Sequence, residues 1–199
     1  MKKLVFTAAS VFGAIFAANA QGGSSESCTG CTALSYDLCT THVTVSLANS
    51  LDMNCDNCND LQACANSISE WSNGLSLGSA SFSVASTKNY SVYAGLSSGT
   101  MSKSGGGTGI GIGSGSNQIQ IKGKVSANNT GGSNMASSAT ALAVRSGNTQ
   151  STAGTKIIGA APASLTQKSA NLQISTGTLP LNMSNGDYSV DVVIAAIQD

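Results

Sequence analysis

The feature that most constrains the fold is the regular alternation of side chains in residues 186–199. Large apolar or small apolar side chains occupy every second position: Tyr188, Val190, Val192, Ile194 and Ala196. Because successive side chains of a β-strand point to opposite faces of a sheet, this period of two predicts a strand with one apolar face. The pair Asn185-Gly186 just ahead is a turn signal. We therefore expect this stretch to form a strand, and a strand must pair with another strand.

Shorter stretches with the same alternation recur along the chain, separated by turns rich in Gly, Asn and Ser. They lie at residues 80–84, 90–96, 119–125, 140–144, 157–158, 172–174 and 179–181. Short strands at regular spacing are typical of an antiparallel β-sandwich. The sequence thus predicts an all-β fold.

Three segments between these strands carry their own expectations. The turn at Lys88-Asn89 separates two alternating stretches and predicts a β-hairpin between them. Residues 97–116 are rich in Gly and Ser and are expected to form a loop, with Ile110 and Ile112 as a short strand. Residues 60–71 are expected to include a short helix.

Residues 1–20 are typical of a secretory signal peptide of bacterial style. Lys2 and Lys3 form the charged start, an apolar run follows, and Ala18-Asn19-Ala20 is a small-x-small cleavage site. We expect an exported protein of the periplasm, the cell surface or the extracellular space, with no membrane span in the mature chain. The expected organisation is a cysteine-rich region at 21–70 and a β-sandwich domain at 71–199. A strand at 42–48 is expected to be part of the sandwich domain.

All six cysteines fall in the cysteine-rich region: Cys28, Cys31, Cys39, Cys55, Cys58 and Cys64. An even number of cysteines in an exported chain favours three disulfides, whose connectivity the sequence leaves open. Two Cys-x-x-Cys pairs also match a four-thiolate zinc site or a redox pair. The oxidising compartment and the lack of a βαβ pattern favour disulfides over both alternatives.

A calcium site is a further alternative in the same region, and its candidate ligands are Asp52, Asn54, Asp56 and Asp60. Oxygen atoms at alternate positions suit a hard cation. However, Asn57 and Ala63 stand where an EF-hand loop has Gly and Glu, so the pattern of that loop is not met. We expect no bound metal and no other cofactor.

No arrangement of residues predicts catalysis. His42 is the single histidine, and the glycines of 105–115 fit neither a dinucleotide nor a phosphate-binding pattern. After loss of Lys2 and Lys3, the nine basic residues fall to seven, which are too dispersed to bind nucleic acid. We therefore expect a protein that is not an enzyme.

Residues 186–199 resemble the C-terminal segment of chaperone–usher fimbrial (pilin) subunits. Those subunits carry a glycine fourteen residues from the end, as Gly186 does here, followed by alternating apolar residues such as Val190, Val192 and Ile194. Residues 82–92 are also similar to a stretch found in other exported bacterial β-sandwich proteins. The resemblance implies an immunoglobulin-like sandwich that lacks one strand, and a neighbouring subunit or a periplasmic chaperone that supplies it by strand addition.

Composition, strand pattern and resemblance together predict a structural subunit of a fimbrium or another bacterial surface fibre. Its assembly residues would be Gly186, Tyr188, Val190, Val192 and Ile194. The expected partners are further copies of the chain or a periplasmic chaperone. The alternative hypothesis is a monomeric secreted β-sandwich that uses its loops to bind a glycan or a surface partner in cell adhesion.

Overall fold

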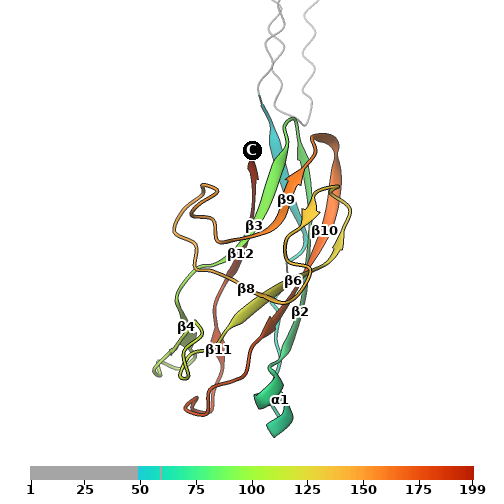
Figure 1. Cartoon of the computed structure of the whole chain (residues 1–199). Coiled ribbons are helices and arrows are strands. Elements are labelled where there is room, and N and C mark those ends of the chain that lie inside the picture. Colours follow the sequence, from blue (N-terminus) through green and yellow to red (C-terminus); the bar gives the residue numbers. More distant parts are fainter. Residues whose placement is uncertain (1–48, 59) are drawn as a thin grey trace, which may run out of the picture. The chain divides into compact units, whose positions relative to one another are not determined.

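The fold is described by a computed structural model for residues 49–58 and 60–199. Short antiparallel strands and one helix follow each other along this part of the chain (Figure 1). Their bounds are β1 Leu51–Asn57, α1 Ile68–Asn73, β2 Ser76–Ser86, β3 Tyr90–Leu96, β4 Thr100–Lys103, β5 Ile110–Gly111, β6 Ile121–Asn128, β7 Ser133–Asn134, β8 Thr140–Ala141, β9 Thr155–Ala161, β10 Ser164–Thr176, β11 Tyr188–Ser189 and β12 Val192–Gln198. The predicted all-β class is confirmed.

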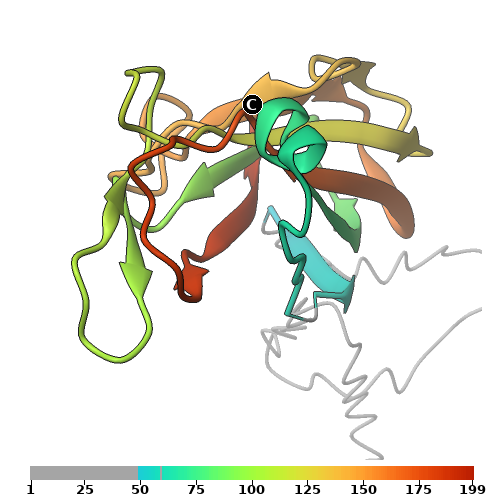
Figure 2. The same ribbon diagram turned by 90° about the horizontal axis from the view of Figure 1, so that it is seen from below.

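The strands form antiparallel sheets that pack together in a sandwich-like arrangement. A five-stranded sheet has the order β1-β2-β10-β6-β8, a four-stranded sheet has the order β12-β3-β9-β7, and a small sheet joins β11, β4 and β5. Apolar residues from the facing strands are fully buried between the sheets, among them Phe82 and Val84 of β2 and Val92 of β3. Figure 2 shows the strands from below, with β1 in cyan and β12 in red.

The predicted hairpin between residues 80–84 and 90–96 is wrong, because β2 and β3 belong to different sheets. The turn after β2 carries the chain from one sheet across to the other. Both strands have large buried side chains, Phe82 on β2 and Tyr90 on β3, which pack from the two sheets into the same core. The Oγ atom of Ser86 donates a 2.7 Å hydrogen bond to the carbonyl of Lys88, which fixes the turn.

Residues 186–199 form two strands rather than one, because the chain breaks at Val190 and Asp191 between β11 and β12. β11 pairs with β4, whereas β12 pairs with β3. The two strands therefore belong to two different sheets. The period-two pattern of the sequence continues through this break, because alternation depends on which face each side chain occupies and not on which strand lies beside it.

The short helix expected within residues 60–71 is confirmed, and it spans Ile68–Asn73. The expectation for the next segment needs correction. Residues 97–116 are not a simple loop, because β4 and β5 pair within them and bury Met101 and Ile110.

Several predictions fall on residues outside the described part of the chain. These are the signal peptide at 1–20, the strand at 42–48, His42, Cys28, Cys31 and Cys39. The described residues from Leu51 onward form one compact unit. β1, which lies in the predicted cysteine-rich region, belongs to this unit and pairs with β2. No helix among the described residues is long and apolar enough to cross a membrane.

Candidate functional site

β12 is an edge strand whose single described pairing partner is β3. The register is unbroken from Val192 opposite Leu96 to Gln198 opposite Tyr90. One further backbone hydrogen bond lies just beyond each end of the paired segment, from Ser97 N to Asp191 O at 3.0 Å and from Asp199 N to Asn89 O at 2.9 Å. β12 is therefore held firmly on its β3 side.

The pattern of these hydrogen bonds fixes which backbone groups of β12 face away from β3. In an antiparallel ladder, hydrogen-bonded residues alternate with residues whose N–H and C=O groups point to the other side. Asp191 and Asp199 are bonded to the β3 side, so residues 193, 195 and 197 are bonded there as well. The N–H and C=O groups of Val192, Ile194 and Ala196 consequently point to the free edge of the sheet.

The same three side chains point into the sandwich, yet they are less buried than their neighbours on β3. Val192, Ile194 and Ala196 pack against the core while remaining half-buried. Directly beside them, Val92 and Ala94 of β3 are 0% exposed. On the opposite face of β12, Val193, Ala195 and Ile197 are apolar and also half-buried. A whole apolar strand thus lies only partly covered.

The edge of the five-stranded sheet, β1, approaches β12 on the same side of the molecule. Met53 of β1 is half-buried against the core, whereas Leu51 and Cys55 are exposed. At one end the two sheets are linked by a hydrogen bond of 3.1 Å from Gln198 Nε2 to Ser86 Oγ. This bond ties the last residue of β12 to the last residue of β2.

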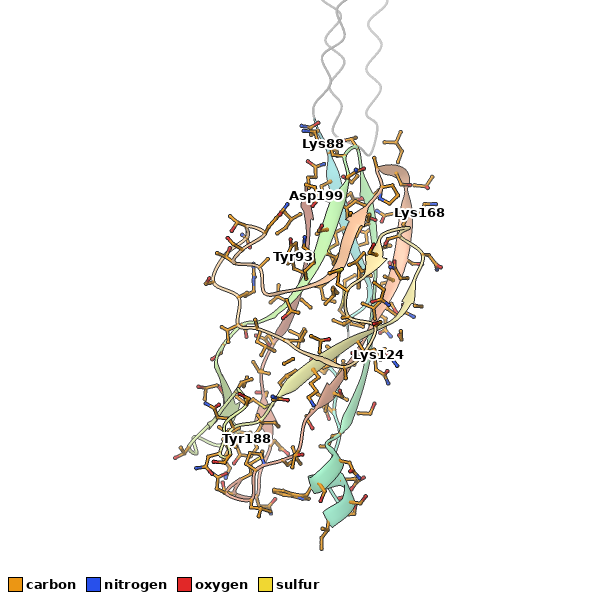
Figure 3. All side chains as sticks on the ribbon, viewed as in Figure 1. Lys88, Tyr93, Lys124, Lys168, Tyr188 and Asp199 are labelled. Carbon is orange, nitrogen blue, oxygen red and sulfur yellow. A yellow bond between two sulfur atoms is a disulfide. The ribbon has the colours of Figure 1, made fainter. Side chains whose placement is uncertain are left out.

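The structure divides the predicted assembly residues between the two strands of this region. Tyr188 belongs to β11, and its hydroxyl donates to Ser184 O at 3.0 Å. Figure 3 labels Tyr188 near the lower end of the molecule and Asp199 at the upper end of β12. Val190 is half-buried between the strands, and Val192 and Ile194 lie on β12. Their role in assembly stays a prediction.

Gly186 has a local structural role. Its φ of +142° is a conformation that side-chain-bearing residues rarely adopt, and an added Cβ would stand 2.6 Å from Lys103 Cε. The Lys103 ammonium group continues past it to Ser184 Oγ, at 2.6 Å. Glycine at this position therefore allows β4 and β11 to close on each other.

The cysteines in the described residues form one close pair. Cys55 and Cys58 lie close together, with their Cα atoms 5.8 Å apart, a separation that suits a disulfide. Cys64 is exposed and has no cysteine partner among the described residues. The remaining pairings of the predicted three-disulfide framework stay open.

The calcium candidates do not converge in the structure. Asp52, Asn54 and Asp56 lie along one face of β1, where alternate residues are about 6.6 Å apart. Asp52 Oδ2 accepts a hydrogen bond of 2.9 Å from Gln167 Nε2, and Asp56 Oδ1 accepts one of 3.3 Å from Ser83 Oγ. Asp60 lies beyond the strand. Across residues 49–58 and 60–199, no group of three or more acidic, histidine or cysteine side chains is placed to hold a metal ion.

Tyr90 lies on β3 opposite the end of β12 and is 0% exposed. Its hydroxyl has no hydrogen-bond partner among the described residues. Burial away from water disfavours the charged phenolate, so the pKa of Tyr90 is raised above its ordinary value. This side chain therefore contributes apolar packing beneath the end of β12 and carries an unsatisfied polar atom.

No protein-family model matches this chain, and no curated protein is similar to it at a significant level. The function must therefore be argued from the geometry of the β12 edge and of the surrounding surface.

Proposed function

We propose that this protein is a structural subunit of a bacterial fimbrium or surface fibre that assembles by addition of a β-strand to the free edge of β12. The observation that carries this proposal is the contrast between β12 and β3. Inward side chains of β3 are completely buried, whereas those of β12 are half-buried beside unpaired backbone groups. An added strand would complete both the burial and the hydrogen bonding.

The binding energy would come from two sources. Val192, Ile194 and Ala196 each offer one N–H and one C=O group, and each hydrogen bond formed contributes about 0.5–1.5 kcal/mol net. Covering the half-exposed apolar side chains contributes a further ~25 cal/mol per Å² of apolar surface buried. A partner strand with apolar residues at alternate positions would match this edge best, because its own inward side chains would lie beside those three.

The other sheet edges are protected against strand addition, which also supports the proposal. β7 and β8 contain two residues each. β1 presents the carboxylates of Asp52 and Asp56 and has a register shift between Cys55 and Asn57. Short edges, charges and irregular registers all hinder pairing with another chain. Residues 192–198 carry none of these devices.

The remaining parts of the proposal follow from the sequence. They are an immunoglobulin-like sandwich, a disulfide-rich N-terminal region, export to the cell surface, and partners that are further copies of the chain or a periplasmic chaperone. We also propose a structural role without catalysis. The competing function is a monomeric secreted binding module, in which the β12 edge would stay unfilled.

The first test is gel electrophoresis of a sheared cell-surface fraction, with and without boiling. A ladder of multimers that collapses to one band on boiling is expected if inserted strands hold the fibre together. A single monomer band in both lanes, with the protein free in the medium or the periplasm, would contradict assembly and favour the binding module.

A pair of proline variants locates the assembly edge. Ala196→Pro removes an N–H group that points to the free edge, so the ladder should be lost while the monomer still folds. Ala195→Pro is the matched control, because it removes an N–H group that is bonded to β3 and should destabilise the monomer itself. Wild-type ladders from a folded Ala196→Pro variant would exclude β12 as the assembly strand.

A further inference from the structure

The end of the molecule that carries α1 is tied to the segment that follows β10. Thr178 Oγ1 donates to the carbonyl of Ser72 at 2.9 Å, and Leu179 N donates to the carbonyl of Trp71 at 2.9 Å. The other end of the helix is capped, because Ser67 Oγ accepts from Glu70 N and the Glu70 carboxylate accepts from Asn66 N. Trp71 is thus held in a fixed position beside residues 178–179.

The opposite side of the same segment is tied to the stretch that leads into β6. Gly177 N donates to the carbonyl of Gln120 at 2.8 Å. Trp71 and Gln120 therefore flank one short segment from two sides.

Two hollows lie on this surface and share the wall formed by Thr178, Leu179 and Leu181. The first has a volume of about 530 Å³ and is bounded on its other side by Ile68, Trp71 and Ser72. Ile68 is 87% exposed and Leu181 is 94% exposed. Trp71 is half-buried against the core and lines this hollow together with these two exposed aliphatic side chains, and burying such apolar surface against a ligand is favourable.

The second hollow, of about 410 Å³, is polar and is lined by Gln118, Gln120 and Lys122. Gln120 and Lys122 are half-buried. Among the residues that the structure describes, no acidic side chain lines either hollow. The lysine ammonium group is therefore available to an anion that enters here, and the amide groups can both donate and accept hydrogen bonds.

We propose that the two hollows form one binding site for an acidic saccharide. The apolar face of one sugar ring would lie on Trp71, with Ile68 and Leu181 at its sides. The amide of Gln120 and the backbone of residues 177–179 would bond the hydroxyl groups of the next ring. Lys122 would pair with the carboxylate of that ring. A single lysine matches one carboxylate rather than the repeated phosphates of a nucleic acid. The site does not depend on strand addition at β12.

The fluorescence of Trp71 tests the proposal directly, because Trp71 is the single tryptophan of the chain. The full-length protein is titrated with trigalacturonate and, as the neutral probe of the same length and linkage, with galactotriose. We expect a saturable change with trigalacturonate, with a dissociation constant at or below about 1 mM, and binding at least tenfold weaker for galactotriose. Equal binding of both trisaccharides, or no fluorescence change with either, would overturn the proposal.

Two matched lysine variants separate a built site from general attraction of anions. Lys122→Gln should weaken trigalacturonate binding about tenfold and leave galactotriose binding unchanged. Lys124→Gln should have no effect, because Lys124 is exposed on the same strand but lines neither hollow. Leu181→Ser, at a fully solvent-exposed position, should weaken both probes. Equal losses from the two lysine variants would show that the affinity is non-specific and would overturn the site.

Discussion

The two main sheets end on the same side of the molecule in strands of the same length, β1 and β12, and these two edges differ in chemistry. β1 carries Asp52 and Asp56 on one face, a register shift and the Cys55–Cys58 pair. β12 is uncharged and regular along its whole length. Charge and irregularity discourage pairing with another chain. Of the two edges, β12 therefore lacks the features that discourage such pairing, whereas β1 has them.

The largest expected effect comes from truncating the inward side chains of the two edges. Ile194→Ala and Met53→Ala should each destabilise the isolated monomer by about 1–2.5 kcal/mol, because both residues are half-buried and full burial corresponds to about 2–5 kcal/mol. In assembled material the loss for Ile194→Ala should approach the full value, while that for Met53→Ala stays constant. Urea unfolding of both forms measures this difference. Identical losses for the two variants in assembled protein would refute the distinction between the edges.

Removing the cysteine pair at the end of β1 tests whether this edge takes part in assembly. Replacing both Cys55 and Cys58 by Ser should destabilise the monomer by about 2 kcal/mol, since the closed loop is short. The yield of multimers, compared at equal amounts of folded protein, should be unchanged. Loss of multimers from a folded double variant would assign β1 a part in assembly.

Adding a positive charge to one edge at a time should have a smaller effect, which is measured on the affinity of strand addition. Val193→Lys places a charge on the outward face of β12 and should weaken strand addition about tenfold, which corresponds to about 1.4 kcal/mol. Asn54→Lys on β1 is the matched control and should leave assembly unchanged. Asn54 is exposed, so its change should move monomer stability by less than about 0.5 kcal/mol. Val193 is half-buried, so its change should cost the monomer about 1 kcal/mol, and assembly is compared at equal amounts of folded protein. Assembly rates from light scattering provide the comparison.

Tyr90→Phe should give the smallest effect, within about 1 kcal/mol of wild type, because it removes a buried hydroxyl that has no partner among the described residues. The pH dependence has a definite sign. A raised pKa means that the folded state holds the proton more tightly, so Tyr90 favours folding below about pH 10 and this contribution is lost as pH rises further. The phenylalanine variant should resist alkaline unfolding better. Identical alkaline midpoints would contradict the shift.

The sequence predicted the all-β class and most strand positions because alternation and turn residues act locally. It did not predict that β2 and β3 lie in different sheets, since the turn at Lys88-Asn89 reverses the chain in the same way for a hairpin and for a crossing. The break at Val190 and Asp191 was hidden for a similar reason. Which strand lies beside which is decided by packing across the core.

The candidate sites show the same division. Alternation within residues 186–199 located β12, but its half-burial depends on what lies beside it in space. The two adjoining hollows have no local signature, because Trp71, Gln120 and Leu181, which line them, come from three separate parts of the chain. Such a site becomes visible only after hydrogen bonds of the 177–179 segment bring those parts together.

The crossing after β2 also has a consequence for the order of folding. β3 enters the four-stranded sheet early in the chain, but its partner β12 follows every other described strand in sequence. During synthesis, Val92 and Ala94 therefore lack their β12 neighbours until the whole sandwich has emerged. Contacts of such large sequence separation slow folding and lengthen the time for which β3 is open to wrong partners. Because β12 pairs with β3 last, a chaperone would have a defined interval in which to bind the open edge of β3.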